Sequence, residues 1–152
     1  MSAAKKLAEL GLVLPPPPAP AGAYTRAVHS HNQIFVSGQL PMANGSIQYA
    51  GAVGRDLDEK AGYEAAKLCA LNALSILQAE SNDLDTVRII RIGGYVCSAD
   101  HFTGQAQVVN GASELFAAVL GERGIHARLA IGVAALPLGA AVELEVIAEL
   151  VS

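Results

Sequence analysis

Two segments with helical periodicity stand between strand-like runs, and this alternation most restricts the folds open to the chain. Residues 59–79 follow Asp58, a residue suited to cap a helix, and their polar side chains recur at helical spacing opposite a broad apolar stripe. Residues 104–120 place four apolar side chains on one face, those of Val108, Ala112, Leu115 and Val119. Each helix must bury its apolar face against other elements, so we expect both helices to lie on one sheet.

The strand-like runs are rich in β-branched residues and end at glycine, proline or asparagine. We predict a short helix at 2–10 and strands at 23–30, 33–38, 86–98, 127–136 and 141–151, with room for a short edge strand in 44–54. This order groups two antiparallel pairs of strands around the helical crossovers. The predicted fold is therefore α+β, with one mixed β-sheet and two helices on one face of it.

At 152 residues the chain fits one domain with a single core. We separate residues 1–22, a helix and a proline-rich arm, from residues 23–152, which form the domain. The run "PPPPAPAG" at 15–22 favours an extended polyproline conformation, so we interpret it as a rigid spacer that leads to the first strand. A ligand for SH3-type domains is the alternative for this run.

The composition indicates subunit contacts and argues against nucleic acid and membranes as partners. Hydrophobic residues make up 52% of the chain and charged residues only 16%, so a lone monomer would have a surface poor in charge. The net charge is -4, and the lysines and arginines are scattered rather than clustered, so nucleic acid is not expected as a partner. The apolar uncharged run 129–142 is too short to span a membrane, and the N-terminus has no signal-peptide pattern. We therefore expect a cytoplasmic protein.

Arg128 heads an apolar stretch that contains no other charged residue before Glu143. Its guanidinium can bind the carboxylate of a ligand through two parallel hydrogen bonds, or it can form a structural ion pair with a glutamate of the last strand. If the turn at 137–140 closes a hairpin, Arg128 lies opposite Glu149 and far from Glu143. Arg128 and Glu143 could then share a ligand only across a contact between two chains.

Alternation along the strand that begins near Arg128 divides its side chains by size. Arg128, Ala130 and Gly132 share one side, while Leu129 and Ile131 share the other. We expect the larger residues to face the helices and the smaller ones to allow close approach by another subunit.

Cysteines and histidines offer weaker candidates for a site. Cys69 and Cys97 match neither a redox nor a zinc-binding spacing, so we interpret them as buried thiols. His29 and His31 would share a strand face, but no third metal ligand is evident. His126 lies just before the arginine, and we interpret it as a solvated loop histidine, with a role in the same cleft as the alternative.

Three stretches of the chain resemble the RidA family, also called YjgF: "FVSGQLP" at 35–41, "VVNGASELF" at 108–116 and "ARLAIGVAALPLGAAVELEVIA" at 127–148. The resemblance covers most of the chain from Tyr24 onward, and the spacing of arginine, leucine-proline and glutamate in the last stretch is its specific part. It implies a chorismate-mutase-like fold assembled as a homotrimer with three clefts between subunits. The N-terminal helix and proline-rich arm indicate a divergent branch.

The resemblance also implies a function. Family members hydrolyse enamine and imine intermediates, such as 2-aminoacrylate, to 2-oxo acids and ammonia, and no metal or organic cofactor is required. The family's carboxylate-binding arginine falls on Arg128, its water-orienting glutamate on Glu143, and its other cleft residues on Tyr24, Gly38 and Asn110. An imine of a 2-oxo acid needs its carboxylate anchored and a water aimed at its electrophilic carbon, and Arg128 and Glu143 suit these two tasks.

Two positions depart from the family pattern. Ala130 stands where many members have a cysteine, and Arg26 stands where a glutamine is common. Arg26 is expected either to add a second cation to the cleft or to face solvent. These departures keep non-catalytic binding or sensing of a small 2-oxo acid open as an alternative to hydrolysis. A further alternative is the endoribonuclease or translation-inhibitor activity also attributed to the family, which the acidic composition disfavours.

Overall fold

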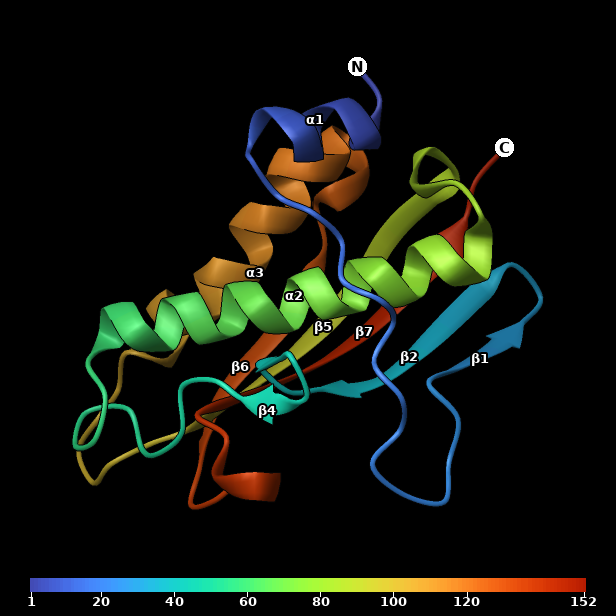
Figure 1. Ribbon diagram of the computed structural model, residues 1–152. Helices are drawn as coiled ribbons and strands as arrows, with labels where there is room; N and C mark the ends of the chain where they lie inside the picture. The colour runs from blue at the N-terminus through green and yellow to red at the C-terminus, as the bar shows by residue number, and fades with distance from the viewer.

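The strands form one five-stranded mixed sheet with helices on a single side (Figure 1). The computed structural model describes residues 1–152. The sheet consists of β1 (Ala27–Ser30), β2 (Gln33–Gln39), β5 (Val87–Cys97), β6 (Ala127–Val133) and β7 (Val142–Leu150). The helices are α1 (Ala3–Glu9), α2 (Glu59–Ser81) and α3 (Gln105–Leu120), and β3 (Met42–Ala43) and β4 (Ser46–Ile47) form a separate small hairpin. The predicted α+β fold with one mixed sheet is confirmed.

The strand order is β1-β2-β7-β5-β6, in which β5 and β6 are parallel and the other neighbours are antiparallel. The predicted hairpin of the last two strands is therefore wrong, because β5 lies between β6 and β7. Their connection, which contains the 3-10 turn η3 (Pro137–Gly139), passes over the end of β5. Cys97 N donates to Ala141 O at 2.8 Å, and Gly51 N donates to Gly139 O at 2.8 Å. These bonds tie the connection to β5 and to the loop around residue 51 instead of closing a tight turn.

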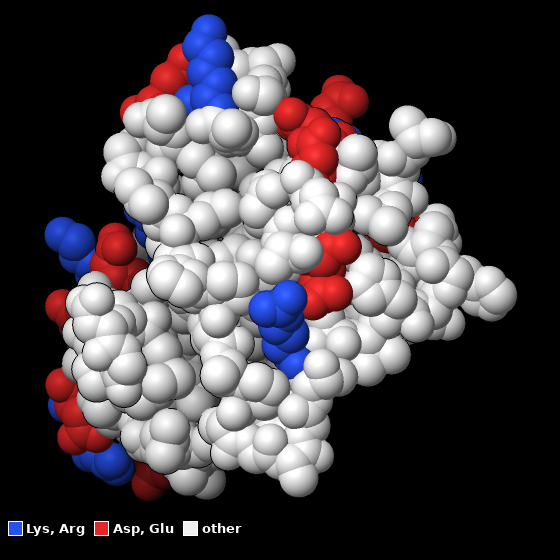
Figure 2. Space-filling view, turned by 45° about the vertical axis from the view of Figure 1, so that its right-hand side comes forward, with Lys and Arg blue, Asp and Glu red and all other residues white.

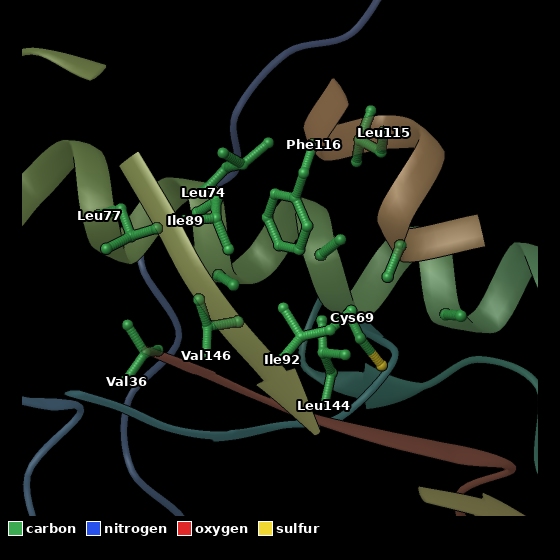
Figure 3. Close-up of a cluster of buried hydrophobic side chains, with 14 of the residues drawn as sticks. Val36, Cys69, Leu74, Leu77, Ile89, Ile92, Leu115, Phe116, Leu144 and Val146 are labelled. Atoms are coloured by element: carbon green, nitrogen blue, oxygen red, sulfur yellow. The ribbon is translucent and has the colours of Figure 1, made fainter. Parts of the chain in front are cut away.

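The core lies between the helices and the sheet (Figure 3). Leu74 of α2 and Phe116 of α3 point toward strand residues such as Ile92 of β5. All four residues predicted for the apolar face of α3 are buried: Val108, Ala112, Leu115 and Val119. The Asp58 side chain accepts a hydrogen bond from a backbone N–H of the first turn and caps α2 as predicted. Both cysteines are buried thiols, which confirms that prediction as well.

The small residues of β6 lie under α3, which reverses the orientation predicted for this strand. Ala130 packs against the core, and a Cβ placed on Gly132 would approach Gln105 Nε2 of α3 to 2.8 Å. The small residues thus allow the side chains of α3 to lie close to this strand. The larger Leu129 and Ile131 consequently lie on the face of the sheet that has no helix.

This helix-free face carries exposed apolar side chains from strands that are far apart in the sequence. Phe35 of β2 is 40% exposed, and Leu129 and Ile131 of β6 are 37% and 39% exposed. Charged residues are also sparse, and lie in separate clusters, on the side of the molecule drawn in Figure 2, which is turned by 45° from the view of Figure 1. A face of this kind is suited to contact with another subunit, although the homotrimer itself stays a prediction. No helix combines the length with the apolar character that a bilayer crossing demands.

Helix α1 packs on α3, and the chain then crosses the outer side of α2. Ala3 and Leu7 are buried in the core, and Ala3 N donates to Asp85 Oδ1 at 2.9 Å. From α1 the proline-rich run passes over α2 and leads to β1 (Figure 1). Pro15, Pro17 and Pro18 are half-buried, so this run lies along the surface of the domain. The division of the chain at residue 22 stays a prediction.

Candidate active site

Arg128 lies near the start of the edge strand β6, and its side chain extends over α3. Nη1 donates to Ser113 Oγ at 3.1 Å, and Nη2 donates to Ala106 O at 3.0 Å. Arg128 forms no ion pair, and Glu149, its expected neighbour in a hairpin, lies 3.6 Å from Arg88 instead. The alternative of a structural ion pair with a glutamate of the last strand is therefore wrong. The permanent charge of Arg128 is not neutralised within the chain.

A hollow of about 290 Å³ lies beside this guanidinium. It is lined by Asn110, Ser113, Gly124, Ile125, His126 and Arg128. Asn110 and Arg128, both predicted for the cleft, are thus brought together. Ser113 was not predicted; the signal that could have found it is its position one helical turn after Asn110, which puts both on one side of α3. His126 lines the hollow, as in the alternative interpretation of this residue.

His126 is half-buried and makes contacts through both ring nitrogens. Nδ1 lies 2.6 Å from Gly124 O, and Nε2 lies 2.9 Å from Ser113 Oγ. The ring packs edge-on against Phe116, with the two ring centroids 5.9 Å apart. Burial lowers the pKa of His126 below its usual value; the hydrogen bond to the Gly124 carbonyl opposes this shift, and the charge of Arg128 adds to it. The imidazole is therefore neutral around pH 7.

Glu143 projects from β7 onto the helix-free face of the sheet. It lies opposite Tyr95 of β5 and against Gly38 of β2, where a β-bulge interrupts the pairing of β2 with β7. A Cβ on Gly38 would collide with Glu143 Oε1, so a larger residue there would displace this carboxylate. Burial raises the pKa of the Glu143 carboxyl above its usual value, and repulsion from Glu145 raises it further. Glu143 is thus a partly desolvated carboxylate.

Tyr24 and Gly38 line one narrow pocket between the proline-rich run and β2. Tyr24 is half-exposed, and its hydroxyl accepts a hydrogen bond from Ala21 N at 3.3 Å. Gly38 also contacts Glu143, so three predicted residues, Tyr24, Gly38 and Glu143, gather near the end of β2.

Arg26 lines the same pocket, but its charge is paired. Its Nε donates to Glu80 Oε1 of α2 at 2.8 Å, and His29 Nε2 lies 2.9 Å from Glu80 Oε2. Hydrogen bonds from His29 and then Arg26 lower the pKa of the Glu80 carboxyl. Neither alternative for Arg26, an additional cation in the cleft or a side chain that simply faces solvent, describes this ion pair. No group of three His, Cys, Asp or Glu side chains is placed to hold a metal ion.

The predicted site residues thus form two groups within one chain. Arg128 pairs in register with Ile92, which is buried under the helices, whereas Glu143 pairs with Tyr95, which lies three positions further along β5. Successive side chains of a strand alternate between its two faces, so an odd separation puts these positions on opposite faces. Within a single chain the two groups cannot contact one small ligand.

Known proteins resemble the chain over nearly all of its length. Residues 4–150 match the family described as "YjgF/chorismate mutase-like, putative endoribonuclease". Protein TCP17 of Trypanosoma cruzi is 45% identical over 149 residues, which cover 97% of this chain and 93% of that protein. The solved structure of Atu1372 from Agrobacterium tumefaciens, a protein with unknown function, has a TM-score of 0.91 at 44% identity and covers 98% of this chain and 92% of that one. RidA from the Antarctic bacterium Psychrobacter sp. PAMC 21119 has a TM-score of 0.63 at 28% identity and covers 88% of this chain and 93% of that one.

The family match and the observed architecture agree. The matched residues include both helices that cover the sheet, all five of its strands and the two groups of site residues. The chain therefore belongs to the YjgF/RidA family, with the chorismate-mutase-like α+β fold that its sequence predicted.

Proposed function

We propose that this protein hydrolyses enamine and imine intermediates of the 2-aminoacrylate type to 2-oxo acids and ammonia, in a cleft between subunits of a homotrimer. One observation carries the proposal: Arg128 has no acidic partner in its chain and lies beside an open hollow. An arginine in this state is suited to bind the carboxylate that every 2-imino acid carries. The proposed reaction needs water as its only co-reactant.

The free donors of Arg128 suit a planar carboxylate. A guanidinium has five N–H donors, and one of these points to Ser113 and one to Ala106. The remaining donors are available to a ligand in the hollow, where two parallel hydrogen bonds would fix the carboxylate in position and orientation. Asn110 lines the same hollow and can contribute an amide hydrogen bond.

The Glu143 carboxylate is suited to direct the attacking water. An enamine first tautomerises to the imine, which moves a proton from nitrogen to carbon. Water then adds to the carbon of the C=N bond while Glu143 takes its proton. The proton passes to the nitrogen of the resulting carbinolamine, whose C–N bond breaks as C=O forms, which releases ammonia and the 2-oxo acid. A carboxylate with a raised pKa accepts a proton from water more readily than an ordinary carboxylate. Gly38 leaves space beside Glu143, and the half-exposed Tyr24 hydroxyl can form the wall of this part of the cleft.

A second copy of the chain can bring together the two groups of site residues that lie apart within one copy. The face that carries Glu143 has exposed apolar side chains and no helix, so its burial against another copy is favourable. Arg128 lies on the edge strand β6, within reach of a neighbour. We place the Arg128 hollow of one subunit against the Tyr24, Gly38 and Glu143 group of the next.

Non-catalytic binding of a small 2-oxo acid is the second candidate. Ala130 favours it, because this residue shares the side of β6 with Arg128 and contributes only a methyl group where many family members have a cysteine. A binding protein would keep the Arg128 contact without accelerating hydrolysis. Endoribonuclease activity, which the family description names, is disfavoured by the net charge of -4.

A coupled reaction tests the proposal. A serine or threonine dehydratase supplies the imine, and the rate of 2-oxo acid release is measured with and without the protein. We expect acceleration, at least a tenfold loss of it in Arg128→Ala, and partial retention in Arg128→Lys, because a charged contact contributes about 1.5–3 kcal/mol. Arg55→Ala is the matched control, because it removes an exposed arginine paired only with Asp56, and should match the wild type.

The other candidates give different results in parallel measurements. Calorimetric binding of pyruvate without any acceleration of imine decay would establish the second candidate. Cleavage of RNA that survives Arg128→Ala would point to a site elsewhere on the protein. If no 2-imino acid is hydrolysed faster, the catalytic proposal is wrong.

A further inference from the structure

His126 and Ser113 line the Arg128 hollow without a role in the proposed reaction, and they form a continuous chain of hydrogen bonds that ends at Arg128. His126 Nδ1 lies 2.6 Å from Gly124 O, and His126 Nε2 lies 2.9 Å from Ser113 Oγ. Ser113 Oγ in turn accepts a hydrogen bond from Arg128 Nη1 at 3.1 Å. We call these four residues, Gly124, His126, Ser113 and Arg128, the histidine relay.

The direction of every hydrogen bond in the relay follows from its two ends. The Gly124 carbonyl can only accept, so His126 must carry its proton on Nδ1. The Arg128 guanidinium can only donate, so the Ser113 oxygen accepts from it and keeps its own single proton for another partner. His126 Nε2 is the acceptor that remains. Every hydrogen bond of the relay therefore has a donor and an acceptor when His126 is neutral and carries its proton on Nδ1.

Packing holds the histidine end of the relay in place. The His126 ring contacts Phe116 edge-on, with an interplanar angle of 86°. A Cβ on Gly124 would collide with Phe116 O, so the turn that carries the relay's terminal carbonyl is pressed against α3. The lowered pKa of His126 keeps the ring neutral around pH 7 and leaves Nε2 free to accept. The relay thus ends on a rigid part of the fold.

We infer that Ser113 and His126 are positioning residues that hold the Arg128 guanidinium in one orientation, with its remaining donors directed into the hollow. An arginine has many rotamers, and a site that fixes the guanidinium before the ligand arrives avoids part of the entropy lost on binding. Ser113 holds Nη1 and the Ala106 carbonyl holds Nη2, so the plane of the guanidinium is fixed from both ends. The inference rests on the proposed function in one respect, which is that the ligand of Arg128 is a carboxylate.

Solution NMR of the full-length protein labelled with ¹⁵N tests the relay without a ligand. We expect the His126 nitrogen shifts of an Nδ1–H tautomer and slowly exchanging, restricted side-chain N–H signals for Arg128. Ser113→Ala should release the Arg128 signals to the averaged behaviour of an exposed arginine, whereas Ser113→Thr keeps the hydroxyl and should preserve them. Arg128 signals that do not change in Ser113→Ala, or an Nε2–H tautomer at His126, would overturn the inference.

Calorimetric titration with pyruvate measures what the relay does for binding. Ser113→Ala and His126→Leu should each weaken binding about five- to tenfold, as expected when a side chain must be ordered by the ligand instead of by the protein. The double variant should be no weaker than the weaker single variant, because both changes break the same relay. His126→Gln keeps an acceptor for Ser113 and should bind nearly as well as the wild type. Gln107→Ala, an exposed change on the same helix, is the control and should have no effect.

The two proposals fail in different ways. If Arg128→Ala abolishes pyruvate binding while Ser113→Ala and His126→Leu bind like the wild type, the relay has no positioning role and the proposed function stands. If the wild type neither binds pyruvate nor accelerates imine hydrolysis, the proposed function fails, and the NMR signals of Arg128 still decide whether the relay orders the guanidinium.

Discussion

At the scale of single residues, Glu143 is an ionisable group in a place where its charge is disfavoured. Burial raises the pKa of its carboxyl, and the neighbouring Glu145 raises it further. A folded-state pKa above the unfolded-state pKa gives stability that is fully present below the unfolded value and is lost as the pH rises through the folded value. The charge that suits Glu143 to water activation therefore lowers the stability of the fold near pH 7.

Replacing this carboxylate with an amide should stabilise the protein. We expect Glu143→Gln to raise the free energy of unfolding at pH 7 by about 0.5–1 kcal/mol, the scale of one partly buried charge interaction, and to abolish hydrolysis. The gain should disappear when the pH falls below the usual carboxyl range, where Glu143 is protonated in both states. Urea unfolding at two pH values and one protein concentration measures this difference. Glu9→Gln, at an exposed position, should show no gain, and an equal gain at both pH values would contradict the explanation.

The residues of the candidate site could be predicted more easily than their contacts. The resemblance to the RidA family predicted Arg128 and Asn110, which share a hollow, and Glu143 and Gly38, which lie against each other. It did not predict that Ser113 contacts both Arg128 and His126, because these contacts join helix α3 to a later segment of the chain. Hydrogen bonds between elements depend on how the elements pack, which spacing within one segment does not determine.

At the scale of elements, one carboxylate joins three of them. Asp85, in the 3-10 turn η1 (Leu84–Thr86), accepts from Ala3 N of α1 at 2.9 Å and from Arg123 Nη2 at 3.1 Å. Arg123, in η2 (Gly121–Gly124), also donates to two backbone carbonyls at 2.9 Å, those of Leu84 and Val87. The N-terminal helix is therefore fastened to the start of β5 by polar contacts as well as by its buried residues.

Loss of this carboxylate should loosen α1 selectively. We expect Asp85→Ala to destabilise the protein by about 1–2 kcal/mol, because the contacts are charge-assisted but partly exposed. Amide hydrogen exchange should show the largest loss of protection in α1 and a smaller loss in η2. Asp100→Ala removes an exposed aspartate and should leave exchange unchanged. Uniform loss of protection throughout the sheet would contradict a local role.

Helices were easier to predict from the sequence than strand pairing. The apolar spacing of α2 and α3 and the Asp58 cap are local features, and both helices are found where they were expected. The pairing of β6 with β5 is not local: proline and glycine at 137–139 fit an arch over β5 as well as a hairpin. The prediction of which side of β6 faces the helices was wrong for a related reason. The close approach of α3 favours small residues on that side, whereas residue size alone suggested that the larger residues would face the helices.

At the scale of the whole molecule, the helix-free face of the sheet should decide assembly. Ile131 lies on this face and is not in the core of its own chain, so Ile131→Asp should leave the fold intact and place a charge in the contact between copies. We expect the wild type to run as a trimer in size-exclusion chromatography with light scattering, and the variant to run as a monomer with an unchanged far-UV circular dichroism spectrum. Val13→Asp, at an exposed position just before the proline-rich run, is the control and should remain a trimer. A monomeric wild type would contradict the assembly.

The placement of Arg128 and Glu143 on opposite faces of one sheet has a consequence for control in the cell. Under the proposed function, a solitary chain is folded yet inert, since neither half of its chemistry can reach the other. At low expression, the rate of hydrolysis would then rise with the square or a higher power of the protein concentration. Any agent that separates the copies would abolish hydrolysis without unfolding them.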